Sequence, residues 1–291
     1  MKPPPVKYAR AGSVQEAVAL LAEHGGDAKV LAGGQSLVPL MSFRLARPEI
    51  LVDINRVDEL SYIRQVGGSL EIGAMTRQRD VELSDVVAGA VPLLPLALHH
   101  VGHVTNRNRG TVGGSIAHAD PASELPALVT GLAGELVIVG PDGARTVAAE
   151  DFFAGPFTTA IDEGELLAAV RLPQLPAGTG VAVEELARRH GDFAVVAVMA
   201  AVHLAADGTV DLVRLAASGV DSVPVRLHAA EAVLAGAAST AETIAAAAAT
   251  VADSIHPTDD VHAPATYRRE MAGLLVERAV AAAVERAEVK A

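Results

Sequence analysis

The chain has 291 residues, a formal net charge of −12 at pH 7 and no cysteine. The acidic balance argues against a nucleic-acid or anionic-membrane surface, and aromatic residues at 3% are too few for stacking platforms that bind single strands. Without cysteine the chain cannot form a disulfide, a catalytic thiolate or an iron–sulfur cluster of its own. A hydrophobic fraction of 51% is enough for a large core, and this length predicts two or three subdomains.

The first part of the chain is predicted to be a small α+β unit. Ser13 with Glu16 three residues later has the form of a capping box, so a helix is expected from there to Gly25 and Gly26. Strands are expected over residues 29–31 and 50–54, with a helix or tight turn over 37–45.

The second part alternates short apolar runs with turn residues. The sequence predicts a hairpin and then a mixture of helices, strands and one polar loop. The hairpin is expected over 62–66 and 70–74, a polar helix opens at 76–80, helices cover 91–101 and 121–132, a loop covers 102–110, and strands cover 135–140, 145–147 and 166–172.

Residues 174–180 have the composition of a linker, and a domain boundary is predicted there. Strands are expected after it over 181–186, 195–204 and 210–217. From about His228 the chain becomes helical and rich in alanine, with helices expected over 241–252 and 264–288, the last one amphipathic.

Targeting signals are absent from the sequence pattern. Residues 1–5 lack the apolar stretch of a signal peptide. No run of about 18 apolar residues predicts a membrane-spanning helix. A cytoplasmic location is therefore expected.

Two glycine segments stand out, each near the end of an apolar run or a polar loop: Ala32-Gly33-Gly34-Gln35-Ser36 and Thr111-Val112-Gly113-Gly114-Ser115. Glycine allows positive φ and close approach of a ligand to the backbone. Successive N–H groups in such a turn form a concave site that suits a phosphate. One such segment is also typical of an ordinary turn, but two of them predict a clamp on the two phosphates of a dinucleotide.

Other chemistry has weaker support in the sequence. His99, His100, His103 and His118 are irregularly spaced, unlike the ligands of a helical zinc motif, so no metal site is predicted. No Gly-x-Ser-x-Gly elbow is present, which argues against a Ser-His-Asp hydrolase.

Several longer motifs, in order along nearly the whole chain, resemble one family, the FAD-binding medium subunits of molybdenum hydroxylases of the aerobic carbon monoxide dehydrogenase and xanthine dehydrogenase type. These motifs are Leu31-Ala32-Gly33-Gly34-Gln35-Ser36-Leu37, Pro48-Glu49-Ile50-Leu51-Val52-Asp53-Ile54, Ile72-Gly73-Ala74-Met75-Thr76, Arg107-Asn108-Arg109-Gly110-Thr111-Val112-Gly113-Gly114-Ser115, Asp120-Pro121-Ala122-Ser123-Glu124-Leu125-Pro126 and Arg189-His190-Gly191-Asp192-Phe193.

The resemblance implies an α+β fold. Residues 1–175 would form a two-lobed FAD-binding domain of the vanillyl-alcohol-oxidase (PCMH) type, with lobes of about 1–57 and 58–175. Residues 178–288 would form a C-terminal domain with a small antiparallel sheet and a helical bundle.

The resemblance also implies an electron-transfer role. The FAD of this chain would receive electrons from the [2Fe–2S] clusters of a small partner subunit and pass them to an external acceptor. A large partner subunit would hold the molybdenum cofactor, in a dimer of heterotrimers that could be peripheral at a membrane. The substrate stays open between carbon monoxide, a purine, an aldehyde and an N-heterocycle. Two alternatives also stay open: a stand-alone FAD-dependent oxidoreductase acting on a small molecule, and a non-catalytic scaffold.

The resemblance implies a set of FAD-binding residues and no catalytic or metal-ligating residue. Asp120 and Glu124 match acidic positions near the ribityl or ribose hydroxyls, Phe193 matches an aromatic that is often tyrosine near the flavin ring, and Val101 and Leu172 match apolar neighbours of the cofactor. The phosphate cradles and the residues beside them are Leu31, Ala32, Gly33, Gly34, Gln35, Ser36, Leu37, Gly110, Thr111, Gly113, Gly114 and Ser115.

Overall fold

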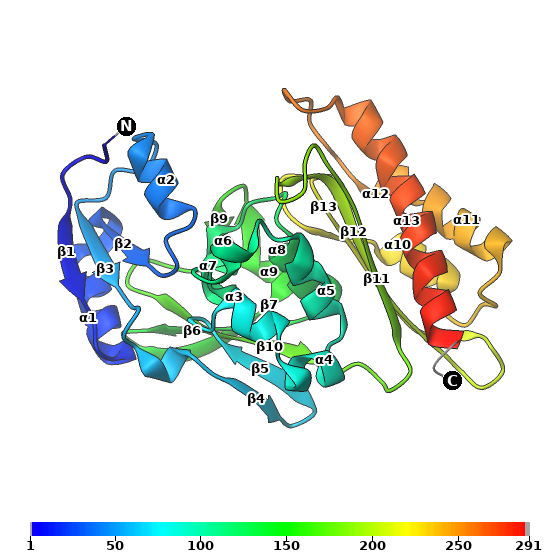
Figure 1. Ribbon diagram of the computed structural model, residues 1–291, viewed down its shortest axis with the longest axis horizontal. Helices are drawn as coiled ribbons and strands as arrows, with labels where there is room; N and C mark the ends of the chain where they lie inside the picture. The colour runs from blue at the N-terminus through cyan, green and yellow to red at the C-terminus, as the bar shows by residue number, and fades with distance from the viewer. Residues whose placement is uncertain (1, 289–291) are drawn as a thin grey trace.

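The computed structural model describes residues 2–288, so Met1, the first residue of the predicted FAD-binding domain, lies outside it. The first lobe is a three-stranded parallel sheet in the order β1-β3-β2, and it forms the blue end of the molecule in Figure 1. Its elements are β1 (Lys7–Arg10), α1 (Val14–His24), the 3₁₀ turn η1 (Gly25–Asp27), β2 (Ala28–Leu31), α2 (Leu37–Ser42) and β3 (Ile50–Asp53).

Local signals explain the first helix. The Ser13 hydroxyl accepts a hydrogen bond from the backbone N–H of Glu16 at 3.1 Å, and the Glu16 carboxylate accepts from the N–H of Gly12 at 2.7 Å. Gly25 ends α1 with a φ of +50°, which favours glycine. The predicted helix is therefore confirmed at both ends.

The second lobe is built on a five-stranded antiparallel sheet in the order β4-β5-β10-β6-β7. The predicted hairpin and the strands around the turn at residues 141–143 are confirmed. The elements are the 3₁₀ turn η2 (Asp58–Leu60), β4 (Ile63–Val66), β5 (Ser69–Gly73), α3 (Gln78–Glu82), α4 (Asp85–Ala90), α5 (Leu93–His100), α6 (Val104–Arg107), α7 (Val112–His118), α8 (Glu124–Gly131), β6 (Glu135–Gly140), β7 (Gly143–Ala148), α9 (Ala149–Phe152), β8 (Phe153–Gly155), β9 (Thr158–Thr159) and β10 (Leu166–Pro173).

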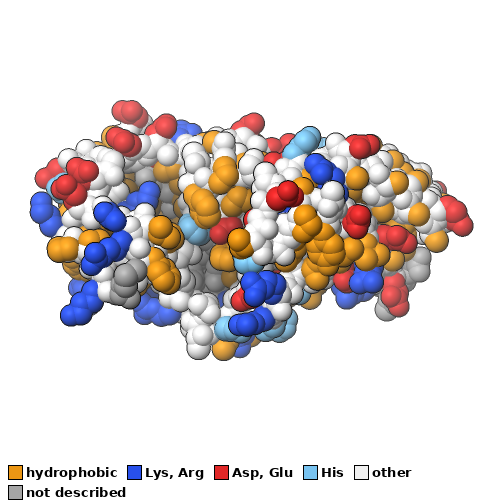
Figure 2. Space-filling view, turned by 90° about the horizontal axis from the view of Figure 1, so that it is seen from above, with side chains coloured by type: hydrophobic (Ala, Val, Ile, Leu, Met, Phe, Trp, Pro, Cys, Tyr) orange, Lys and Arg blue, Asp and Glu red, His pale blue; other side chains and the backbone are white. Residues whose placement is uncertain are grey.

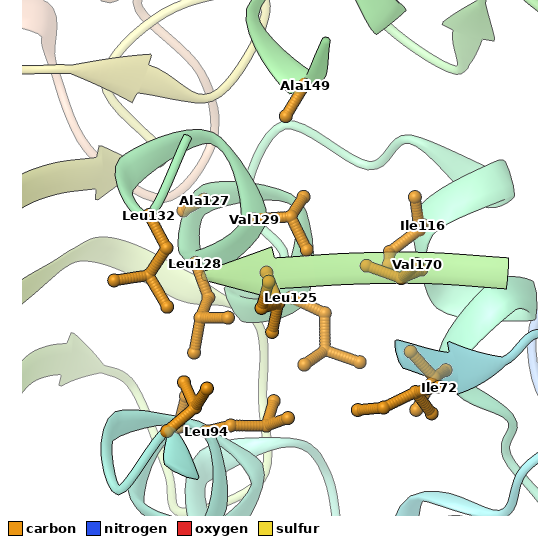
Figure 3. Close-up of a cluster of buried hydrophobic side chains, with 14 of the residues drawn as sticks. Ile72, Leu94, Ile116, Leu125, Ala127, Leu128, Val129, Leu132, Ala149 and Val170 are labelled. Carbon is orange, nitrogen blue, oxygen red and sulfur yellow. The ribbon is translucent and has the colours of Figure 1, made fainter. Parts of the chain in front are cut away.

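The core of this lobe lies between the sheet and helices α5, α7 and α8. Figure 3 shows Ile72 and Val170 of the sheet beside Ile116 and Leu125 of the helices. Every residue of α8 is buried, because the next sheet covers its other side: a Cβ placed on Gly131 would lie 2.6 Å from the Cβ of Ala216. A helix between two sheets buries its polar residues along with its apolar ones.

The C-terminal part is an antiparallel sheet in the order β11-β12-β13-β14 with helices packed on one face (Figure 1). The predicted antiparallel sheet is confirmed. A Cβ on Gly180 would lie 1.9 Å from the carbonyl oxygen of Ala283, so the last helix presses directly on the first strand. The elements are β11 (Gly180–Ala187), β12 (Ala194–Leu204), β13 (Val210–Ser218), β14 (Val225–Arg226), α10 (His228–Leu234), α11 (Ala241–Ala249), α12 (Val251–Ser254) and α13 (Ala265–Glu288).

Some sequence predictions are wrong in detail. The expected polar loop over 102–110 contains the one-turn helix α6, and the second glycine segment is the start of α7 rather than a loop. The helix expected over 241–252 breaks into α11 and α12. Such short elements depend on tertiary packing, since isolated helices of one or two turns are not stable in water. Within residues 2–288, no helix combines the length and apolar character that spanning a bilayer requires.

Candidate functional site

The two glycine segments lie against each other. A Cβ on Gly33 would be 2.4 Å from the carbonyl oxygen of Arg109 and 2.8 Å from the Cα of Gly110. The Cβ of Ala32 lies 3.5 Å from where a Cβ on Gly114 would be. Segments from two lobes, far apart in the sequence, therefore share one site, which we call the cradle (residues 32–37 and 109–115).

The first half of the cradle is an open set of donors. The backbone N–H groups of residues 33–37 have no hydrogen-bond partner among the residues that the structure describes. Gly34 has a φ of +72°, and its carbonyl accepts from the N–H of Val38 at 3.1 Å to begin α2. Five successive free donors in a turn form the concave anion site that the glycines predicted.

The second half of the cradle differs from the expectation. Thr111 caps α7, since its hydroxyl accepts from the N–H of Gly114 at 3.0 Å. The N–H of Gly113 donates to the carbonyl of Ala74 at 2.9 Å, and that of Ser115 to the carbonyl of Thr111 at 3.2 Å. The prediction of a second open nest is therefore wrong. This half offers a close backbone and the hydroxyl groups of Thr111 and Ser115, which can still donate.

Two residues that the sequence analysis missed join the lobes at the cradle. Asn55 donates from Nδ2 to the carbonyl of Ala32 at 2.9 Å, and Arg77 donates to Oδ1 of Asn55 at 2.8 Å. Arg77 also donates to the carbonyl of Arg109 at 2.5 Å. One signal pointed to Asn55: it follows β3, and parallel strands β2 and β3 end at the same edge, where ligands of such sheets bind.

The acidic pair behaves differently from a pair of free carboxylates. Asp120 bonds within its own turn, accepting from the N–H of Ala122 at 2.9 Å. Glu124 is 3% exposed, and burial raises the pKa of its carboxyl group to about 8. At neutral pH it is therefore a protonated group that can donate a hydrogen bond as well as accept one.

Three further residues were expected near the cofactor, namely Val101, Phe193 and Leu172. Val101 ends α5 and its carbonyl accepts from Arg107 at 3.0 Å. Phe193 is 54% exposed in the turn between β11 and β12. Leu172 is buried in the core of the second lobe. In β10 the carbonyl of Ala168 accepts from the N–H of Ala74, and the carbonyl of Ala74 in turn accepts from Gly113 of the cradle.

The cradle fits a diphosphate group. Its open amides suit an anion, and a Cβ at Gly33 would fill the contact between the two halves. Figure 2 shows the surface hollowed between the first lobe, at the left, and the middle of the molecule. Within residues 2–288, no three His, Asp or Glu side chains, the histidines considered above included, lie together so that they could hold a metal ion.

Comparison with known proteins defines the class. Residues 4–175 match the family model described as the FAD binding domain in molybdopterin dehydrogenase, and residues 181–283 match the carbon monoxide dehydrogenase flavoprotein C-terminal domain. These matches define a flavin-containing oxidoreductase subunit. The chain belongs to the family of FAD-binding medium subunits of molybdenum hydroxylases.

Individual relatives agree along the full length. The chain is 42% identical to the carbon monoxide dehydrogenase medium chain of Hydrogenophaga pseudoflava, over 97% of this chain and 98% of that one. It is 40% identical to the alpha subunit of the 6-hydroxypseudooxynicotine dehydrogenase complex of Paenarthrobacter nicotinovorans, over 99% and 97%. A solved structure of the Hydrogenophaga enzyme, lacking the Mo-pyranopterin moiety, superposes with a TM-score of 0.96 at 43% identity, covering 98% of this chain and 99% of that one.

Proposed function

We propose that this chain binds one FAD without a covalent link and transfers electrons from the [2Fe–2S] clusters of a partner subunit to an external acceptor. Residues 1–175 would be the FAD-binding domain and residues 178–288 the C-terminal domain. The observation that supports this most directly is the meeting of the two glycine segments beside five free backbone donors.

The proposed FAD site uses the cradle for the diphosphate. The N–H groups of residues 33–37 would donate to one phosphate, and the hydroxyls of Thr111 and Ser115 to the other. Glu124 would bond a ribityl or ribose hydroxyl, with Asp120 beside it. Phe193 and Val101 would lie near the rings; Leu172 is a weaker candidate, because the core encloses it.

The division of labour follows from the chemistry available in this chain. The isoalloxazine of FAD, when bound, supplies the redox chemistry, and the protein supplies binding, orientation and electrostatics. With no cysteine, this chain offers no thiolate for an iron–sulfur cluster, so the clusters would belong to a partner. A large subunit with the molybdenum cofactor would complete a heterotrimer, and two heterotrimers a dimer.

The substrate of the complex would be set by the large subunit. The two relatives above are named for carbon monoxide and for 6-hydroxypseudooxynicotine, yet their identities to this chain are 42% and 40%. Relatives named for different reactions are thus almost equally similar to this chain. We propose the carbon monoxide dehydrogenase type for this subunit, which the match of its C-terminal domain supports, and assign no substrate.

Titration of the purified chain with FAD tests the binding, and purification from the native host tests the complex. We expect one FAD per chain, released on denaturation, and co-purification with molybdenum- and iron-containing subunits. A chain that binds no FAD, alone or in its complex, would overturn the proposal. A complex with FAD but without iron and molybdenum would favour the stand-alone oxidoreductase.

A further inference from the structure

Three ionisable side chains on α5, α8 and β11 lie near enough to one another that the charge of each affects the others. They are His100, Glu124 and Glu185, and we call them the buried triad after its two buried carboxyl groups; the side chain of His100 is 28% exposed. Nδ1 of His100 lies 3.6 Å from Oε1 of Glu185, whose side chain is 5% exposed. Oε2 of Glu185 is buried without a hydrogen-bond partner in the part of the chain that the structure describes. An unpartnered buried carboxylate oxygen is costly, so its retention calls for a reason.

The buried triad is continuous with the cradle. Oγ of Ser115, in the second half of the cradle, lies 3.3 Å from Oγ of Ser123. Ser123 precedes Glu124, which begins α8, and Val101 follows His100 at the end of α5. The triad therefore lies next to the proposed FAD site, and Glu124 belongs to both.

A row of histidines continues from the partly exposed His100 to the protein surface. The ring centroids of His100 and His99 are 6.2 Å apart, and those of His99 and His190 are 5.9 Å apart. His103 continues the row at 5.9 Å from His190. The side chain of His99 is 70% exposed. Histidine exchanges protons readily near neutral pH, so this row is a chemically suitable route for a proton.

The charges around the buried triad allow it to hold a variable number of protons. The contact with Glu185 raises the pKa of His100, and Glu124 and Glu184 act in the same direction. Burial raises the pKa of Glu124, and the charges of Glu185 and Asp120 raise it further.

At the outer end of the row, His99 lies near a carboxylate that already has a charged partner. Glu82 lies 3.9 Å from His99 and is already paired with Arg107 at 2.9 Å. Near neutral pH the raised pKa of Glu124 keeps that carboxyl group protonated, and the raised pKa of His100 favours its protonated form.

We propose that the buried triad is a proton-exchanging site that compensates the charge arriving on the bound flavin, with His99 and His190 connecting it to water. This inference rests on the proposed function, whose iron–sulfur donors deliver the two electrons. As they arrive, an N–H bond of the His100 imidazolium breaks at Nδ1 and an O–H bond forms at Oε1 of Glu185. His100 then regains its proton from water along the histidine row. One proton is taken up for two electrons, and no other bond changes.

The experiment measures the midpoint potential of the FAD-loaded protein by spectroelectrochemistry between about pH 5 and about pH 9, which covers the ordinary titration of histidine and an upward shift of it. Glu185→Gln and His100→Asn each remove the exchange. We expect both to reduce the dependence of the potential on pH by one proton per two electrons. This is a tenfold change in equilibrium constant per pH unit, or about 30 mV. The matched control is His203→Asn, which removes a histidine paired with Asp211 at 3.0 Å outside the triad.

A second measurement needs no cofactor. The imidazole of His100, followed by NMR in the FAD-free protein, should titrate above the ordinary range, and Glu185→Gln should bring it back. Glu185→Asp and His100→Gln replace any variant that circular dichroism shows to be unfolded. Equal pH slopes in the FAD-loaded wild type and variants would overturn the inference and leave the proposed function standing. A protein that binds no FAD would overturn the proposed function, and this inference with it.

Discussion

Arg77 donates a hydrogen bond to Oδ1 of Asn55 at 2.8 Å, across the boundary between the two lobes. Each partner also binds one segment of the cradle: Asn55 donates to the carbonyl of Ala32, and Arg77 donates to that of Arg109. Both side chains are half-buried, so water competes weakly for these bonds. The pair therefore holds the two glycine segments next to each other.

Asn55→Ala should weaken FAD binding while leaving the protein folded. The variant loses the bonds to Ala32 and Arg77, and a net loss of about 0.5–1.5 kcal/mol per bond corresponds to an affinity about tenfold lower. Flavin fluorescence titration measures the dissociation constant. Asn108→Ala, an exposed asparagine of the same segment as Arg109, is the control and should bind FAD normally. Unchanged affinity in Asn55→Ala would show that the interlobe pair does not support the cradle.

Gly33→Ala should separate the two halves of the cradle. The new Cβ would lie 2.4 Å from the carbonyl oxygen of Arg109, a backbone atom that cannot turn aside. Overpacking of this kind costs about 1–3 kcal/mol, and we expect a lower melting temperature together with loss of FAD. Gly89→Ala is the control, because no atom lies within 4 Å of its added Cβ. Full FAD content in Gly33→Ala would contradict the close contact.

Glu124→Gln should change how stability depends on pH. The pKa of Glu124 is about 8 in the folded protein, against the ordinary value of 4.5 that applies to the unfolded chain. Between these values the unfolded chain has lost the proton and the folded chain keeps it, so wild-type stability falls as pH rises from about 4.5 to about 8. The shift corresponds to up to about 5 kcal/mol.

The Glu124→Gln variant has no such proton to lose. It should therefore gain stability relative to wild type across that range, and the difference should level off above it. Urea unfolding of the FAD-free proteins at a series of pH values measures the effect. A difference that does not vary with pH would mean that Glu124 is charged in the folded protein.

Glu71→Gln should destabilise the sheet of the second lobe. The Glu71 side chain is 2% exposed and accepts from Arg171 at 2.6 Å, Arg64 at 2.5 Å and the Tyr62 hydroxyl at 2.7 Å. Although burial opposes ionisation, these bonds hold its pKa down at about 2. Its contribution to stability is therefore present above about pH 4.5 and is lost as pH falls toward 2.

We expect Glu71→Gln to cost about 2–3 kcal/mol at neutral pH, because two arginines lose a charged acceptor. The cost should shrink in acid, where wild type loses the same interaction. Denaturant unfolding at neutral and acidic pH measures both values. Glu135→Gln is a suitable control, since that carboxylate only approaches Arg171 at 4.0 Å and is 55% exposed. Equal costs for the two variants would contradict this account.

Much of the architecture could be predicted from short patterns. Ser13 and Gly25 marked the ends of α1, and the turn at 141–143 marked the hairpin of β6 and β7. The glycine motifs pointed to both halves of the cradle. Short elements such as α6 and β1 were missed, because their own sequences are too brief to favour a structure without packing.

The site was harder to predict because its details depend on partners distant in sequence. From the sequence, the backbone N–H groups of Gly113 and Gly114 were expected to be free to bind a phosphate. In the fold they donate to the carbonyl of Ala74 and to the hydroxyl of Thr111. Leu172 matched a cofactor neighbour by motif, and only the fold shows that its side chain is enclosed in the core of the second lobe.

Composition and local motifs were enough to indicate an acidic, cysteine-free α+β protein with two phosphate-binding glycine segments. These properties follow from interactions within a few residues, such as capping and the backbone freedom of glycine. Only the tertiary structure shows that Gly33 lies against the backbone of Arg109 and that a hydrogen bond between Arg77 and Asn55 joins the two lobes. It also made Glu124 a neutral acid, because α8 lies between two sheets. Burial and long-range contact depend on the whole chain, and no short stretch of sequence contains them.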